Sequence, residues 1–177
     1  MRVNGKRPIV VRRAPGRGSE ARVELAHRVL KAVIGRGGVR AMKREGDGGT
    51  PPGRFPIRLV LYRADRVRRP STALPIRAIR KDDGWCDDPS DRNYNRLTRL
   101  PSRRSAEGLR REDHLYDLVL VLGFNDRPRV KGKGSAIFVH LARSDYAPTE
   151  GCIAFSRRDF SAVLAELRRD SVFLVTP

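Results

Sequence analysis

Ser135-Ala-Ile-Phe-Val-His140 and Cys152-Ile-Ala-Phe155 are two short apolar runs near the end of the chain. Eleven residues separate His140 from Cys152, and Pro148-Thr-Glu-Gly151 closes that interval. Short apolar runs bounded by turn-forming residues are typical of buried strands. We therefore expect a core strand that ends at His140, adjacent to a second core strand at residues 118–122, and a loop that can fold Cys152 back toward His140.

Apolar runs of the same kind recur along the chain, at residues 9–11, 55–62, 118–122 and 172–175. Residues 21–34 mix strand and helix periods, and their local pattern favours a helix. Near the end, Ser156-Arg-Arg-Asp159 has the character of a capping box before a helical apolar face. The sequence therefore predicts a mainly β, α+β domain that finishes with one helix and one strand.

Composition narrows the class of protein. A chain of 177 residues suits one domain, which we divide into a basic N-terminal segment with a candidate first strand (1–20) and the domain proper (21–177). The only cysteines, Cys86 and Cys152, rule out a disulfide framework and a metal site of several thiolates. No apolar stretch approaches the roughly 20 residues of a membrane helix, and no signal-peptide core precedes the domain.

The chain is strongly basic, with 38 Lys and Arg against 20 Asp and Glu and a net charge of +18. Such a surface attracts polyanions. Nucleic acid, an anionic membrane and an acidic wall polymer would all be attracted, so net charge does not distinguish among these partners. Residues 64–114 form a long polar insertion that contains the only tryptophan. We expect this insertion to be either an ordered functional region or a flexible one.

Cys152 and His140 are the candidate nucleophile and base. A thiol nucleophile needs a nearby base, commonly a histidine brought close by folding. Gly151 lets backbone approach a substrate, and amides around such a turn can hold an oxyanion. Free cysteine is also among the most buried residue types. Local features therefore favour two interpretations equally: a catalytic pair, or a packed Cys152 thiol with His140 merely capping a strand. Cys86 lies beside Asp87 and Asp88, which oppose thiolate formation.

Two separated motifs resemble the L,D-transpeptidase (YkuD-type) family. The His140-to-Cys152 segment is similar to its catalytic segment, and Gly46-Asp-Gly-Gly-Thr-Pro-Pro-Gly-Arg-Phe55 resembles its Gly-Asp-x-x-Thr-Pro-x-Gly-x-Phe signature. Trp85-Cys-Asp-Asp-Pro89, Tyr94-Asn-Arg96 and Asp113-His-Leu-Tyr-Asp117 look like elements of a subgroup. The resemblance covers about residues 30–177 and implies strands, not a helix, at 21–34.

The resemblance implies a cysteine acyltransferase that acts on peptidoglycan stem peptides without cofactor or metal. It assigns Cys152 as nucleophile, His140 as base and Gly151 to the oxyanion site. Thr149, Glu150, Trp85, Tyr94 and Arg96 are expected to bind substrate. The sequence departs from the family pattern at Glu150, where a histidine is usual, and at Ala154-Phe155-Ser156, where an arginine or asparagine is usual.

Alternatives remain open at this point. One is a hydrolase of the same fold, of the L,D-carboxypeptidase or amidase type. Another is a non-catalytic basic domain that binds wall polymer or nucleic acid, although the resemblance makes nucleic acid no obligatory partner. The substrate implies the cell envelope or periplasm, whereas the lack of a recognisable signal peptide leaves the cytoplasm open. The sequence does not give the oligomeric state.

Overall fold

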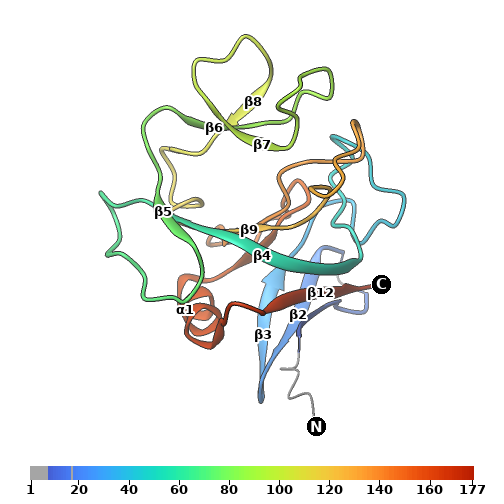
Figure 1. The fold of residues 1–177 in the computed structure, drawn as a ribbon. Helices are drawn as coiled ribbons and strands as arrows, with labels where there is room; N and C mark the ends of the chain where they lie inside the picture. The colour runs from blue at the N-terminus through green and yellow to red at the C-terminus, as the bar shows by residue number, and fades with distance from the viewer. Residues whose placement is uncertain (1–7, 17) are drawn as a thin grey trace, which may run out of the picture.

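The structure is a computed structural model that describes residues 8–16 and 18–177 (Figure 1). Its main sheet has nine strands in the order β12-β1-β2-β3-β11-β10-β9-β4-β5. These strands are β1 (Ile9–Arg13), β2 (Glu20–Leu25), β3 (Arg28–Val33), β4 (Gly53–Tyr62), β5 (Ile76–Ala78), β9 (Leu118–Leu122), β10 (Phe138–Leu141), β11 (Ile153–Phe155) and β12 (Val172–Thr176). The prediction of a mainly β domain is confirmed.

The main sheet closes on itself. Strand β12 pairs in parallel with β1 and antiparallel with β4, so that eight strands form a ring and β5 extends it beside β4. Because β1 pairs with both β2 and β12, the strand within residues 1–20 is part of this sheet. Closure leaves few free strand edges, which limits unwanted pairing with other chains.

Residues 21–34 form the β2–β3 hairpin, so the helix favoured by their local pattern is wrong and the strands implied by the family resemblance are confirmed. Ala21, Val23 and Leu25 alternate into the core, as expected for a strand with one buried face. The helical spacing in this segment is overruled by pairing with β1 on one side and β11 on the other.

Strand β9 is buried on both faces, which explains its uninterrupted apolar sequence. Leu118, Leu120 and Leu122 face the main core, whereas Val119 and Val121 face a second apolar cluster. Strand β10 pairs antiparallel with β9, so the two adjacent core strands predicted from the sequence are confirmed. Alternate residues of β10 divide between the same two clusters.

The one helix in the described part of the chain, α1 (Arg157–Glu166), follows β11 directly. Ser156 is its N-cap and accepts a hydrogen bond from the Asp159 amide at 3.1 Å, as its sequence predicted. Phe160, Val163 and Leu164 are buried in the main core. The helix thereby fixes the direction of the chain between β11 and β12.

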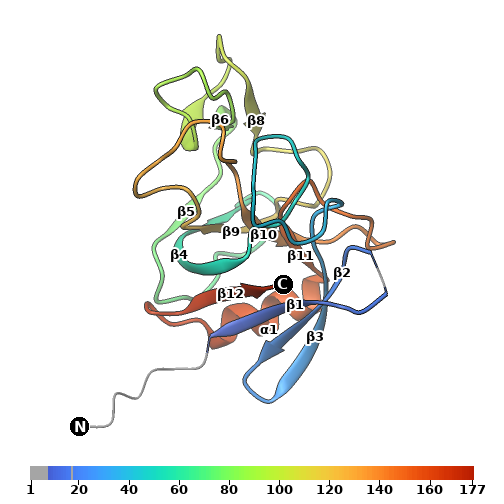
Figure 2. The same cartoon turned by 90° about the vertical axis from the view of Figure 1, so that its right-hand side faces the viewer.

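A small sheet lies over the second apolar cluster. Its strands are β6 (Asp83–Cys86), β7 (Arg96–Arg99) and β8 (Ala106–Gly108), in the order β7-β6-β8. The polar insertion at 64–114 is therefore partly ordered into strands, and Figures 1 and 2 show the small sheet at one end of the molecule, away from β1 and β12. Trp85 packs edge-on against Phe138 with ring centroids 5.1 Å apart, which joins the small sheet to β10.

Candidate active site

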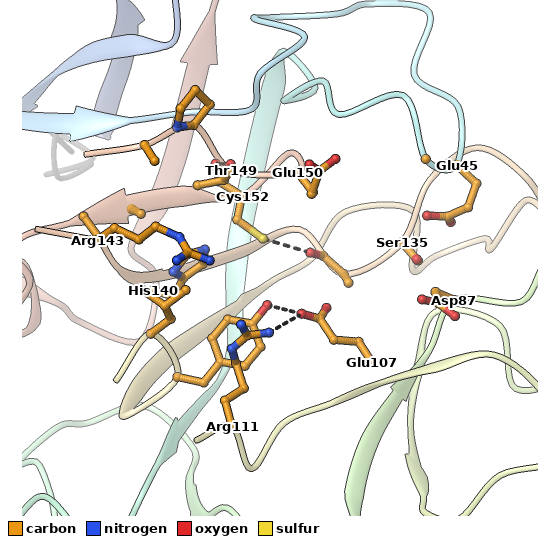
Figure 3. Close-up of a pocket in the computed structure, with 18 residues that line it drawn as sticks. Glu45, Asp87, Glu107, Arg111, Ser135, His140, Arg143, Thr149, Glu150 and Cys152 are labelled. Carbon is orange, nitrogen blue, oxygen red and sulfur yellow. Dashed lines mark hydrogen bonds and ion pairs between the residues drawn. The ribbon is translucent and has the colours of Figure 1, made fainter. Parts of the chain in front are cut away.

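Parallel pairing of β10 and β11 brings His140 and Cys152 to one face of the main sheet. His140 lies opposite Ala154, and Cys152 precedes Ala154 by two residues. Because side chains two apart on a strand share a face, Cys152 lies on the same side as His140. Both line a pocket of about 600 Å³ between the main sheet and the small sheet (Figure 3).

The Cys152 thiol is buried and held by backbone groups. Its Sγ donates to the Ala136 carbonyl at 3.2 Å and accepts from the Phe138 amide at 3.4 Å. Burial raises the pKa of Cys152 to about 12, and the nearby carboxylate of Glu107 acts in the same direction. In the resting protein the group is therefore a thiol, not a thiolate.

His140 is oriented by a main-chain acceptor. Its Nδ1 lies 2.8 Å from the Leu141 carbonyl oxygen, and because a carbonyl can only accept, Nδ1 carries the proton and Nε2 has the free lone pair. The Tyr116 ring packs against the imidazole with centroids 5.2 Å apart. Burial lowers the pKa of His140 to about 4, so near neutral pH the imidazole is an uncharged base.

The two glycine-containing segments of the sequence meet beside Cys152. Gly151 has φ +130°, and a Cβ there would lie 2.8 Å from the Gly49 carbonyl oxygen. Thr50 joins the segments, because its hydroxyl accepts from the Gly35 amide at 2.9 Å and donates to the Gly151 carbonyl at 2.8 Å. The motif at residues 46–55 therefore supports the backbone of the nucleophile turn.

Thr149 and Glu150, both predicted to bind substrate, line the pocket in the turn before Cys152. The Thr149 hydroxyl donates to the Cys152 carbonyl at 2.6 Å and accepts from the Gly151 amide at 3.2 Å. Glu150 is largely exposed, and its carboxylate accepts from Arg36 Nε at 2.9 Å. Thr149 thus shapes the turn, while Glu150 stands at the rim of the pocket.

Trp85, Tyr94 and Arg96 lie outside the lining of the Cys152 pocket. Trp85 and Arg96 line a separate hollow of about 320 Å³, which we call the second hollow. The buried Tyr94 hydroxyl donates to the Glu45 carboxylate and accepts from the Gly134 amide at 3.0 Å. The structure therefore places these three predicted substrate-binding residues behind or beside the pocket wall.

Asn95 connects that wall to the nucleophile. Its Oδ1 accepts from Trp85 Nε1 at 2.9 Å and from the Ala136 amide at 3.1 Å, and Ala136 offers its carbonyl to Cys152. Its Nδ2 donates to the carbonyls of Phe124 and Asn125, both at 2.9 Å. The Asn95 amide group is fully used in fixing the loop that precedes β10.

Several residues that line the pocket were not predicted as site residues from the sequence. They are Glu45, Asp87, Glu107, Arg111, Tyr116, Ser135 and Arg143. Tyr116 lies within the Asp113–Asp117 segment, which was one of the subgroup motifs and could have pointed to it. Glu107 lies in polar sequence without periodicity, so no local signal indicated its place.

A model of the L,D-transpeptidase catalytic domain, YkuD, matches residues 9–173 of the chain. The chain belongs to this family. Comparisons with curated proteins and with solved structures gave no match. Membership agrees with the mainly β fold that ends in one helix and one strand, and it supports an enzymatic function of the L,D-transpeptidase type in general.

Cys86 and Cys152 are both free and buried. Burial is the largest cause that raises the pKa of Cys86, and the charges of the neighbouring aspartates raise it further. Among residues 8–16 and 18–177, no group of three or more His, Cys, Asp or Glu side chains is placed to hold a metal ion. Within the same residues, no helix has the length and apolar character to span a membrane.

Proposed function

We propose that the protein is a cysteine acyltransferase that acts on peptidoglycan stem peptides, with Cys152 as nucleophile and His140 as base. The observation that carries the proposal is the placement of both side chains on one pocket, with His140 Nδ1 fixed by the Leu141 carbonyl and Nε2 left to take a proton. A pocket of about 600 Å³ has the size of an ordinary ligand site.

Acylation transfers one proton and exchanges one bond. As Cys152 Sγ attacks the peptide carbonyl carbon, His140 Nε2 takes the thiol proton and then gives it to the leaving amine as the peptide C–N bond breaks. Because burial keeps both groups uncharged in the resting protein, the thiol proton has to move to His140 as part of the reaction. The product of this step is a Cys152 thioester and a free amino acid.

The oxyanion is held by amides of the nucleophile turn. The Gly151 N–H bonds the Thr149 hydroxyl at 3.2 Å, a long bond that a charged oxygen can replace. An amine or a water molecule then attacks the thioester, its proton passes to His140, and the Cys152 thiol is restored. The amine gives a cross-linked product, which is transpeptidation, and water gives the hydrolase alternative.

The substrate assignment rests on family membership and on charge. Stem peptides carry carboxylates, which arginine can bind through two parallel hydrogen bonds, and the chain has a net charge of +18. Action on this polymer would place the protein in the cell envelope. The hydrolase of the same fold shares every acylation step, so only the fate of the thioester separates the two reactions.

Defined tetrapeptide stems test the proposal. The wild-type protein should release the terminal residue and give either a linked dimer or a tripeptide, and Cys152→Ala should abolish both products. Cys86→Ala is the matched control and should keep the wild-type product spectrum. Activity retained by Cys152→Ala would rule out the nucleophile. Incubation with a carbapenem adds a direct check, since a mass adduct at Cys152 is expected.

A further inference from the structure

The side of the pocket away from His140 and Arg143 is acidic although the chain as a whole is strongly basic (Figure 3). We call it the acidic wall, and it consists of Glu45, Asp87, Glu107 and Ser135. Three carboxylates and a hydroxyl in a chain of net charge +18 form a local region that attracts cations. The acylation chemistry of Cys152 does not use any of them.

Strand pairing in the small sheet brings two of these carboxylates together. Trp85 of β6 pairs with Glu107 of β8, and Asp87 follows Trp85 by two residues. Asp87 and Glu107 therefore share one face of the small sheet, diagonal to each other. Burial is the largest cause of the raised pKa of Glu107, and the negative charge of Asp87 raises it further. The proximity of the two carboxylates is therefore electrostatically unfavourable.

Neighbouring cations balance the acidic wall only in part. Lys43 is held by Asp47 at 2.5 Å and by the Arg44 carbonyl at 2.7 Å. Arg111 directs its two-pronged contact to Asp113 and reaches Glu107 only at 3.8 Å. Lys43 and Arg111 therefore make their hydrogen bonds with other partners, and Arg143 lies on the opposite side of the pocket (Figure 3).

Two polar atoms of the acidic wall have no hydrogen-bond partner among the residues that the structure describes. They are Asp87 Oδ1 and Ser135 Oγ, and both atoms are buried. Ser135 is only 7% exposed, and Figure 3 shows its hydroxyl directed into the pocket between Glu45 and Asp87. Because buried polar atoms are nearly always paired in folded proteins, these two mark the place of a missing hydrogen-bonding group.

We propose that the acidic wall binds a primary ammonium group of the peptide substrate, an inference that rests on the proposed function of the pocket. An ammonium group has three donors and a compact positive charge, which match the free acceptors Asp87 Oδ1 and Ser135 Oγ and the carboxylate of Glu107. The surrounding carboxylates keep the bound amine protonated, so it does not act as a nucleophile. The acidic wall therefore selects the peptide that acylates Cys152.

Two peptides and three variants test the ammonium site. The peptides are a stem tetrapeptide with a free side-chain amine at its third residue and the same tetrapeptide with that amine acetylated. Asp87→Asn and Ser135→Ala alter the acidic wall with little change in shape. Asp88→Asn is the matched control, because Asp88 bonds Ser90 and Arg104 and does not line the pocket. Thermal melting confirms that each variant is folded.

The first measurement is kcat/KM for formation of the Cys152 acyl-enzyme, followed by mass spectrometry. With the free-amine peptide, Asp87→Asn should lose at least about tenfold, as expected for one hydrogen bond to a charged group, and Ser135→Ala should lose less. Neither variant should change the lower rate with the acetylated peptide, and Asp88→Asn should match the wild type. Equal wild-type rates with the two peptides, or equal losses with both in Asp87→Asn, would overturn the ammonium site.

The second measurement separates this site from the proposed reaction. Calorimetric titration of the Cys152→Ala protein reports peptide binding without acylation, and it should detect the free-amine peptide at least about tenfold more tightly than the acetylated one. If that preference appears but the wild type never becomes acylated, the ammonium site stands and the acyltransferase proposal falls. If acylation occurs but neither measurement distinguishes the peptides, the ammonium site falls and the acyltransferase stands.

Discussion

At the scale of single residues, the buried, uncharged His140 links catalysis to folding. Its pKa of about 4 in the folded protein lies below the usual value of about 6.5. Between these two pH values, His140 is therefore protonated in the unfolded chain but uncharged in the folded protein. The stability that His140 contributes is complete above pH 6.5 and is lost as the pH falls toward 4.

The variant His140→Gln removes this titration and tests it. Between pH 7 and pH 4 the free energy of unfolding of the wild type should fall by about 3 kcal/mol more than that of the variant, from roughly 1.4 kcal/mol per pKa unit. Chemical denaturation at several pH values measures both proteins. The comparison cancels the opposite contribution of Glu107, whose raised pKa is present in each. Parallel curves would show that folding does not lower the pKa of His140.

The reactivity of the Cys152 thiol gives a second test at this scale. Because burial raises its pKa to about 12, alkylation by iodoacetamide should be slow at pH 7 and should rise about tenfold per pH unit up to pH 10. The Cys86→Ala background leaves Cys152 as the single reporter. Glutathione is the control and should level off near pH 9. A plateau for Cys152 below pH 8 would indicate a thiolate already formed in the resting protein.

At the scale of elements, the contact between the 46–55 segment and the nucleophile turn depends on Thr50. Thr50→Val keeps the shape but leaves the Gly35 amide and the Gly151 carbonyl without their partner. Since each unsatisfied buried group costs about 1–3 kcal/mol, the loss of both partners should lower the free energy of unfolding by about 2 to 6 kcal/mol. Acylation of Cys152 should also slow, because Gly151 is then less firmly placed.

Thr50→Ser supplies the control, because its hydroxyl can keep both hydrogen bonds. Its free energy of unfolding should stay closer to that of the wild type, and its rate of acylation should be nearly unchanged. Denaturation curves and acyl-enzyme mass spectra measure the two variants side by side. Equal losses in Thr50→Ser and Thr50→Val would contradict the prediction, because they would show that the hydroxyl of Thr50 contributes no more to stability than its methyl group.

The elements differ in how far the sequence could predict them. Strand β9 was evident, because Leu118–Leu122 is apolar at every position and a strand buried on both faces requires that. The β2–β3 hairpin was not evident from local pattern, because its apolar residues satisfy both periods and the deciding pairs, such as Ala154 with Val33, are distant in sequence. Its prediction came from the family resemblance.

The site divides in the same way. His140 and Cys152 flank one loop, and their shared pocket could be expected from adjacent strands. Asp87 and Glu107 come from an insertion without periodicity, and only the pairing of β6 with β8 places them on one face. Trp85 and Tyr94 were predicted as substrate contacts, and in the structure they contact Phe138 and the pocket residue Glu45. Aromatic residues in a polar segment can support the residues that line a pocket as well as line the pocket themselves.

At the scale of the whole molecule, the excess positive charge gathers partly around the second hollow. Arg96, Arg127 and Arg129 line it, while the single acidic side chain there, Asp126, is paired with Arg58 at 2.8 Å. Burial lowers the pKa of Arg129, and the like charges of Arg96 and Arg127 add to the effect. Arginines that repel one another in this way attract a polyanion, whether wall polymer or nucleic acid.

Salt dependence and charge removal test whether this surface binds a polymer. The double variant Arg127→Gln, Arg129→Gln should weaken retention on purified sacculi. Its log–log slope of duplex DNA affinity against salt should flatten by up to about 0.9 for each phosphate that the protein no longer neutralises. A matched double variant on the exposed side of the β2–β3 hairpin, Arg22→Gln, Arg28→Gln, removes equal charge from another face. If both pairs have the same effect, net charge alone draws the polymer. If instead DNA binding is tight and persists as salt rises, the interaction with DNA is not mainly electrostatic, and the nucleic-acid alternative takes precedence over the wall polymer.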